Sequence, residues 1–266
     1  MKMTLDTVSF TVTAPGAAGV AAAVVAGDSA QVRSTGNIIG GILLGLWTNA
    51  QAVGFTQVLF PYGHDMSRNI RYRNTAISPV NAIPSWASQP MKSQDLITVT
   101  QAGSAVAGDV ETIHALLGYP DLDGGSDKYI NVDELQGRCE ELVTIEDTVT
   151  ATAASAYSGA RALNAVTTTL KANRNYAVLG ALIGGNGGAL SIRGQDTGNL
   201  RASLPANQLS QPETRDWFVR LSEKSGLPCI PVINAANQAN TFIELMTNEN
   251  LLAVPFSLML ALLEEK

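Results

Sequence analysis

The sequence predicts an all-β protein made of two similar β-sandwich domains, with short helices confined to the loops. Three features predict this class. Short stretches of alternating or continuous apolar residues follow one another, turn-forming residues separate them, and the order of residues repeats once along the chain. The repeat is about 130 residues long, which is the size of a domain and well beyond the ~20–50 residues of solenoid repeats.

The repeated residues keep their order, and the offset between the copies varies only from 130 to 138 residues, as small loop insertions would produce. The matches are Thr11–Ala14 with Thr148–Ala151; Asn37 with Asn175; Gly63, Asp65, Asn69 and Arg71 with Gly194, Asp196, Asn199 and Arg201; Trp86 with Trp217; and Ile97, Val99, Ala102, Val110 and Glu111 with Ile230, Val232, Ala235, Ile243 and Glu244. We therefore predict a first β-sandwich over residues 1–120, an acidic junction over 121–141 and a second β-sandwich over 142–266.

Two kinds of apolar pattern predict the strands. Period-two alternation over Val8–Thr13, Leu96–Thr100 and Ala165–Lys171 predicts strands with one face on a core and one in solvent. The continuous apolar runs Ile38–Leu44 and Tyr176–Ile183 predict strands that are buried on both faces. Turn signals separate the strands, at Ala14–Gly16, Gly27–Asp28, Gly184–Gly188 and Gly226–Pro228.

Helical patterns are sparse. We predict one or two helical turns at Val110–Leu117 and a short helix at Asp133–Leu142. The strongest helix is expected over Pro212–Ser222, where a proline stands near the start and apolar residues recur at helical spacing. The matching region around Trp86 has prolines on both sides, so an irregular loop is expected there.

The composition limits the classes of partner. Charged residues make up 15% of the chain against ~25% in typical domains, and small polar residues replace them. Such a surface suits broad contact with other subunits, because little charge must be desolvated. A secreted protein, or a soluble protein that needs little thermal stability, would have the same composition. The net charge is −6 and lysine and arginine form no run, so nucleic acid is not expected as a direct partner.

The ends and the cysteines indicate where the chain is made. Met1–Asp6 lacks the apolar core of a signal peptide, and the longest apolar stretches, Ile38–Trp47 and Leu251–Leu263, are shorter than a membrane span of ~20 residues. We therefore expect synthesis in a host cytoplasm and no transmembrane segment. Cys139 and Cys229 belong to no CxxC pair of the kind that binds zinc, and we expect them to be buried free thiols. The alternative is a disulfide between them.

The repeated Gly-x-Asp…Asn-x-Arg unit is the sharpest motif, and it follows a strand expected over Phe55–Phe60. One interpretation places two ligand sites there, for example for sugar hydroxyls. The other, which we favour, is a turn in which the carboxylate binds backbone N–H groups or the arginine. The side chains concerned are Asp65, Asn69 and Arg71 in the first copy and Asp196, Asn199 and Arg201 in the second.

The junction contains a partial match to a calcium loop. Over residues 123–134 the match has Asp123, Asp127 and Glu134 at ligand positions 1, 5 and 12. It fails at position 3 and at position 6, where Lys128 replaces the glycine of the sharp turn. We therefore expect a solvated acidic linker, with a calcium site as the alternative.

The sequence offers no catalytic set. His64 and His114 pair with no nucleophile motif, and Gly184–Gly188 lacks the lysine of a phosphate-binding loop. We predict no catalytic residue and no cofactor, and therefore no enzyme. The three tryptophans are expected to anchor cores or interfaces: Trp47, Trp86 and Trp217.

The duplicated residues over 8–118 and 142–264 make the chain similar in architecture to duplicated β-sandwich viral coat proteins, and double jelly-roll capsid proteins are the nearest class. The resemblance implies two jelly-roll barrels per chain, standing side by side, and three chains in a capsomer of pseudo-sixfold outline. It also implies that the chain is a major capsid subunit of a bacteriophage-like virion. The partners would be the chain itself, as a homotrimer and higher assembly, and other virion proteins.

Two points bear on this resemblance. The repeats are short for that class and have no long tower insertions. The apolar runs Ile38–Leu46, Tyr176–Ile183 and Leu251–Leu263 would form the cores and the seams between subunits. A function from another class is a tandem carbohydrate- or surface-binding module of the lectin or adhesin kind, with paired sites at the repeated Asp/Asn/Arg units.

Overall fold

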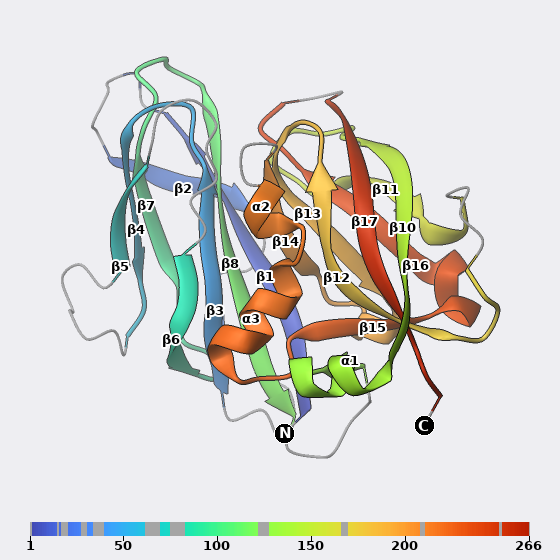
Figure 1. Cartoon of the computed structure of the whole chain (residues 1–266). Helices are drawn as coiled ribbons and strands as arrows, with labels where there is room; N and C mark the ends of the chain where they lie inside the picture. The colour runs from blue at the N-terminus through green and yellow to red at the C-terminus, as the bar shows by residue number, and fades with distance from the viewer. Residues whose placement is uncertain are drawn as a thin grey trace.

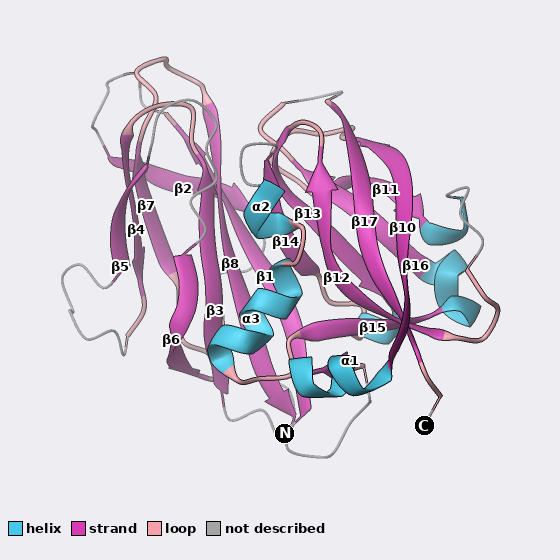
Figure 2. Ribbon diagram, in the orientation of Figure 1, coloured by secondary structure: helices cyan, strands magenta, loops and turns pink. Residues whose placement is uncertain are grey.

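The computed structural model describes most of the chain and confirms an all-β fold with short helices (Figure 2). Among the described residues, no helix is long and apolar enough to cross a membrane. The described residues are 2–14, 16, 21–27, 31–33, 40–61, 70–74, 83–121, 128–165, 170–207, 211–249 and 252–265.

Residues 2–121 form one antiparallel sheet of eight strands, in the order β5-β4-β7-β2-β1-β8-β3-β6. We call this part the first half. Its strands are β1 (Lys2–Thr13), β2 (Ala21–Gly27), β3 (Gly40–Asn49), β4 (Gly54–Leu59), β5 (Ile70–Asn74), β6 (Ile83–Lys92), β7 (Thr98–Ala102) and β8 (Val110–Asp121).

Residues 128–265, the second half, form two sheets, in the orders β10-β17-β12-β15-β9 and β11-β16-β13-β14. The strands are β9 (Tyr129–Ile130), β10 (Cys139–Thr150), β11 (Ser158–Ala162), β12 (Asn175–Ile183), β13 (Asn186–Gly194), β14 (Ala202–Asn207), β15 (Ile230–Asn234), β16 (Thr241–Met246) and β17 (Ala253–Leu263). The helices are α1 (Val132–Arg138), α2 (Gln211–Thr214) and α3 (Trp217–Ser225), with short 3-10 segments η1 (Leu163–Ala165), η2 (Gln195–Thr197) and η4 (Ala235–Asn240).

The eight long strands of each half pair in the same order. In the first half, β1, β8, β3 and β6 lie side by side, and so do β2, β7, β4 and β5. When β9 is left out and the strands are counted from β10, the second half has the same order: β10, β17, β12 and β15 in one sheet, and β11, β16, β13 and β14 in the other. This two-sheet wrapping is the jelly-roll arrangement of two interlocked Greek keys. Among the described residues, the halves differ in two pairings. In the first half β1 also pairs with β2 over Phe10–Val12, which joins its two sheets into one, and in the second half the short strand β9 pairs with β15.

The strand orders show which repeated residues occupy equivalent places. Thr11–Ala14 and Thr148–Ala151 both lie at the end of the first long strand of their half. The last matches are displaced by one strand, because Val99 lies in a seventh strand whereas Val232 lies in a sixth. As equivalences these matches are wrong, since apolar alternation fits a neighbouring strand equally well.

The predicted turns at Val110–Leu117 are wrong, because these residues belong to the central strand β8. Both faces of β8 are buried. Ile113 and Leu117 pack in the core of the first half, while Leu116 packs against the second half. A strand without a polar face has no visible period of two, so its sequence also fits a helical pattern.

Other elements differ from expectation in detail. The region of Trp86 is the edge strand β6, not a loop, and an edge strand accommodates the prolines on either side. The Pro212–Ser222 helix is broken into α2 and α3. The helix expected at Asp133–Leu142 ends at Arg138, where β10 begins. No strand forms at Ala165, Leu170 or Lys171, the described part of the strand predicted there.

The continuous apolar runs predicted strands correctly. Residues 40–44 of the run Ile38–Leu44 lie in β3 and Tyr176–Ile183 lies in β12, and each strand lies inside its sheet; Ile38 and Ile39 lie outside the described residues. Burial on both faces was predicted for both strands, but Leu182 of β12 is only partly buried. The alternating segment Leu96–Thr100 enters β7 with Ile97 and Val99 buried and Leu96 exposed. The segment Val8–Thr13 lies in β1, but its second face is covered by the second half and not by solvent.

Helix α3 lies between the two halves, as Figure 1 shows, with β6 on one side and β12 and β15 on the other. The link between α2 and α3 passes close to Gly180 of β12. A Cβ atom at Gly180 would lie 2.2 Å from the carbonyl oxygen of Thr214 and 2.7 Å from that of Arg215. The glycine is therefore required for this close backbone approach.

We predict that Gly180→Ala lowers the free energy of unfolding by about 1–3 kcal/mol, because backbone atoms must move to admit the methyl group. Gly137→Ala is the matched control. A Cβ atom at Gly137 in α1 would meet nothing within 4 Å. Gly137→Ala should therefore raise the free energy of unfolding by about 0.5–1 kcal/mol, because alanine loses less backbone entropy than glycine when a helix forms. Urea unfolding measures both, and a Gly180→Ala protein as stable as wild type would contradict the packing described.

Candidate functional site

The two halves meet along a buried seam, formed by β1, β3 and β8 on one side and by β13, β14 and α3 on the other. Five apolar side chains of the first half belong to the same buried cluster as the core of the second half: Met3, Leu5, Leu44, Trp47 and Leu116. A separate cluster, which includes Phe10 and Ile113, forms the core of the first half. The seam is therefore part of one continuous hydrophobic core, unlike the more polar interfaces by which separate domains usually meet.

Trp47 of β3 is the centre of the seam and is fully buried. Its indole Nε1–H donates to the carbonyl oxygen of Gly188 in β13 at 2.9 Å. Its ring stands edge-on to Trp217 of α3, with ring centroids 5.7 Å apart, and stacks on His114 of β8 at 5.3 Å. Tryptophan suits this place because it combines a large apolar area with one directed donor.

A chain of polar side chains crosses the seam beside Trp47. The hydroxyl of Ser9 lies 2.8 Å from Nδ1 of His114 and donates to the hydroxyl of Tyr157 at 3.1 Å. The Tyr157 hydroxyl in turn lies 3.1 Å from that of Ser203. The bond between Ser9 and Tyr157 joins the two halves, while His114 and Ser203 hold these two hydroxyl groups from within their own halves. The chain therefore favours one position of the halves relative to each other.

His114 is neutral in this setting. Its Nε2 lies 3.0 Å from the hydroxyl of Thr112, and a Cβ atom at Gly188 would come within 2.7 Å of the same nitrogen. Burial lowers the pKa of His114 from its ordinary 6.5 to about 3. The imidazole therefore serves as a hydrogen-bonded part of the seam at neutral pH.

Charged groups line one margin of the seam. Asp6 accepts from the guanidinium of Arg33 at 2.6 Å and from the backbone N–H of Arg201, across the seam, at 3.3 Å. The side chain of Arg201 binds Glu244 at 3.0 Å. Burial opposes the charge of Glu244, but hydrogen bonds from Arg193 and Arg201 outweigh it and hold the pKa of this carboxyl below its usual range.

In the second copy of the predicted motif, the carboxylate holds a turn. Asp196 accepts from the backbone N–H of Asn234 at 3.0 Å and from the side chain of Asn237 at 2.9 Å. Asn199 adopts a left-handed conformation with φ of 59°. The arginine of the motif, Arg201, binds Glu244 and so stabilises the margin of the seam.

The first copy is described only at Arg71, whose guanidinium carbon lies 3.8 Å from the ring centroid of Phe55. Asp65 and Asn69 lie outside the described residues, as does His64. Both oxygens of Asp196 are engaged by its own chain, so the second copy gives the sugar-binding interpretation no support.

The junction was predicted as a solvated linker, and its described part is packed. Tyr129 and Ile130 form β9, which is buried and pairs with β15. Glu134 pairs with Arg138 at 2.8 Å, and its backbone N–H is capped by Asn131. Asp123 and Asp127 lie outside the described residues; within those that are described, no cluster of three potential metal ligands occurs.

The two cysteines differ in exposure, and both are free. Cys229 is buried, which raises the pKa of its thiol to about 12. Cys139 is exposed at the start of β10, so the prediction of a buried thiol is wrong there. The reason is that β10 is the edge strand of its sheet.

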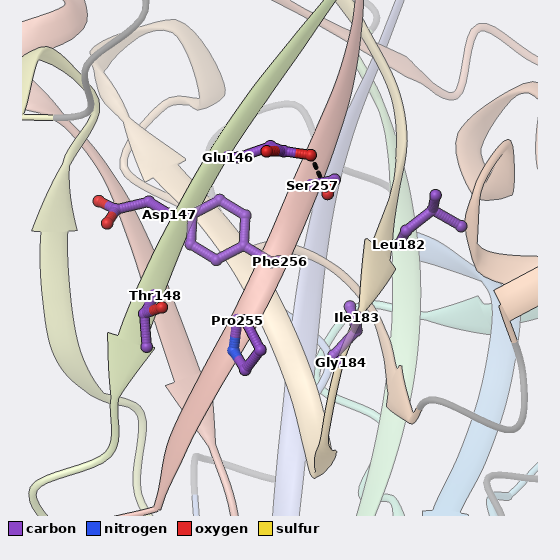
Figure 3. A pocket seen from close by; sticks show the side chains of 9 residues that line it. All are labelled: Glu146, Asp147, Thr148, Leu182, Ile183, Gly184, Pro255, Phe256 and Ser257. Carbon is purple, nitrogen blue, oxygen red and sulfur yellow. Dashed lines mark hydrogen bonds between the residues drawn. The ribbon is translucent and has the colours of Figure 1, made fainter.

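An open groove of about 540 Å³ lies where β10, β17 and β12 run side by side in the second half (Figure 3). Leu182 and Pro255 supply apolar surface, and Glu146 and Asp147 bring carboxylates to its rim. The Glu146 carboxylate accepts from the hydroxyl of Ser257 at 3.2 Å. Such a groove suits a contact that combines apolar surface with positive charge.

Sequence analysis missed the seam residues Ser9, His114, Tyr157 and Ser203. Each stands in a strand or loop without a motif, and contact between them depends on how the halves are placed. Trp47 was expected to anchor a core or an interface, and its burial confirms this. The only sequence signal for the seam was an apolar run at β3 without a polar face.

No protein-family model and no curated protein matches the chain. Solved structures that are similar include the exported protein XepA of PBSX, with 8% identity, a TM-score of 0.29, and coverage of 94% of this chain and 86% of that one. The major capsid protein P2 of bacteriophage PM2 has 8% identity, a TM-score of 0.24 and 98% coverage of both chains. The STIV MCP has 10% identity, a TM-score of 0.23, and coverage of 98% and 97%.

The buried His114 predicts a dependence of stability on pH. Between pH 6.5 and about 3 the unfolded chain binds a proton that the folded chain excludes, so acidification removes stability. The loss is up to about 1.4 kcal/mol for each pH unit below 6.5. Urea unfolding at pH 7 and at about pH 4.5 should show a smaller loss for His114→Gln than for wild type. Equal losses in the two proteins would contradict the neutral, buried imidazole.

Proposed function

We propose that this chain is a structural subunit that assembles with copies of itself, and more specifically a coat subunit of a bacteriophage-like virion. One observation carries the proposal: two halves with the same strand order are fixed side by side by a shared buried cluster. A chain built in this way offers two similar but non-identical building blocks in a single rigid unit.

The finer part of the proposal is a homotrimer. Three chains with two halves each supply six similar positions around a threefold axis, and differences between the halves let the contacts within and between trimers differ. A common origin of the two halves by duplication belongs to the same proposal, and their identical strand orders support it.

The surface also supports assembly. In the described part of the chain, four large apolar side chains are more than half exposed, at 56–65% of their area: Val53, Leu96, Val106 and Leu142. They lie on both halves, near strand ends or on the edge strand β10. Together with the low share of charged residues, they lower the desolvation cost of subunit contacts. Several weak contacts then add up in a closed assembly.

We expect the purified protein to sediment as a trimer or a larger closed particle, because each subunit would bury several contacts of ordinary size, ~1,600 Å² in total per interface. Sedimentation velocity over a hundredfold range of concentration measures this, and negative-stain microscopy shows the outline. A monomer that persists at the highest soluble concentration would contradict the proposal.

A further inference from the structure

Two surfaces at opposite ends of the molecule complement each other in charge. The first is the groove of Figure 3, which we call the acidic groove and define by Glu146, Leu182, Pro255 and Ser257. Glu146 is exposed and accepts a hydrogen bond from the hydroxyl of Ser257. Among the described residues, the neighbouring Asp147 has an ion pair, with Arg161 at 2.6 Å, whereas Glu146 has none.

The second surface is a basic patch on the outer face of β4 and β5, defined by Phe55, Leu59, Arg71 and Arg73. In β5 the side chains alternate: Ile70 and Tyr72 pack on the core of the first half, while the two arginines are exposed. Phe55 and Leu59 are partly exposed beside them. The patch therefore offers positive charge over apolar surface, as the groove offers negative charge over apolar surface.

The two surfaces cannot meet within one chain. Strand β5 is an edge strand of the first-half sheet, and β10 is an edge strand of the five-stranded sheet of the second half (Figure 1). Each is paired on one side only in the chain, so its other edge has no strand partner among the described residues. Exposed edges of this kind are usually covered by a partner or protected by charge.

We propose that the acidic groove of one copy receives the basic patch of a second copy, in a head-to-tail contact. The inference rests on the proposed self-assembly and names the surfaces that carry it. Joining different patches in a head-to-tail way closes into a ring when the rotation between copies permits it. Opposite charges over apolar surface set the register of such a contact and disfavour contacts between like halves.

A charge exchange tests the pairing. Glu146→Arg alone and Arg71→Glu alone should each raise the dissociation constant of the assembly at least tenfold, because like charges then face each other across the contact. The protein that carries both changes should recover most of the wild-type affinity. Glu223→Arg, which makes the same change at an exposed carboxylate of α3, is the control for net charge and should assemble as wild type does. Sedimentation velocity measures assembly, and circular dichroism on heating checks that each variant folds.

The outcomes separate this inference from the proposed function. A wild-type protein that stays monomeric overturns the proposed function and this inference with it. A wild-type protein that assembles, with Glu146→Arg and Arg71→Glu assembling equally well, overturns only the head-to-tail contact. The same holds if both single variants are weakened and the combined variant is not restored, or if Glu223→Arg is weakened to the same degree.

Discussion

Burial of β1, β3 and β8 on both faces is the constraint on which the rest of the structure depends. One face of these strands completes the core of the first half, and the other contributes Leu5, Trp47 and Leu116 to the core of the second. Exposing either face would return a large apolar area to water, and each Å² of apolar surface so exposed costs ~25 cal/mol of stability. Domains joined in this way do not rotate freely, in contrast to domains that meet across a small polar contact.

The polar groups of the seam add direction to this apolar contact. Apolar packing alone tolerates sliding, whereas the hydrogen bond from Ser9 to Tyr157 across the seam needs a defined distance and direction. A displacement of one half along the other would break this bond, at a cost of about 0.5–1.5 kcal/mol. Apolar packing thus holds the two halves together and the polar groups set their relative position, and a rigid subunit with two domains requires both.

The sequence predicts the class of the fold better than the relation between its parts. The apolar runs at Ile38–Leu44 and Tyr176–Ile183 identified β3 and β12, since length and apolar character suffice for a buried strand. The sequence of Val110–Leu117 also fits a helical pattern, because both faces of β8 are buried and no polar face marks the period of two. The seam could not be predicted, because the proximity of Ser9 to Tyr157 depends on the relative placement of two halves and not on any local pattern.

The two halves form one mechanical unit through their shared core, and hydrogen exchange along a urea titration tests this most directly. Brief labelling with deuterium, followed by mass spectrometry of peptides, reports the opening of β3 and of β12 separately in the same sample. The shared core predicts that both strands become labelled over the same urea range, in one cooperative transition. Labelling of the first-half strand at clearly lower urea, while the second half remains protected, would show that the two halves do not unfold as one unit.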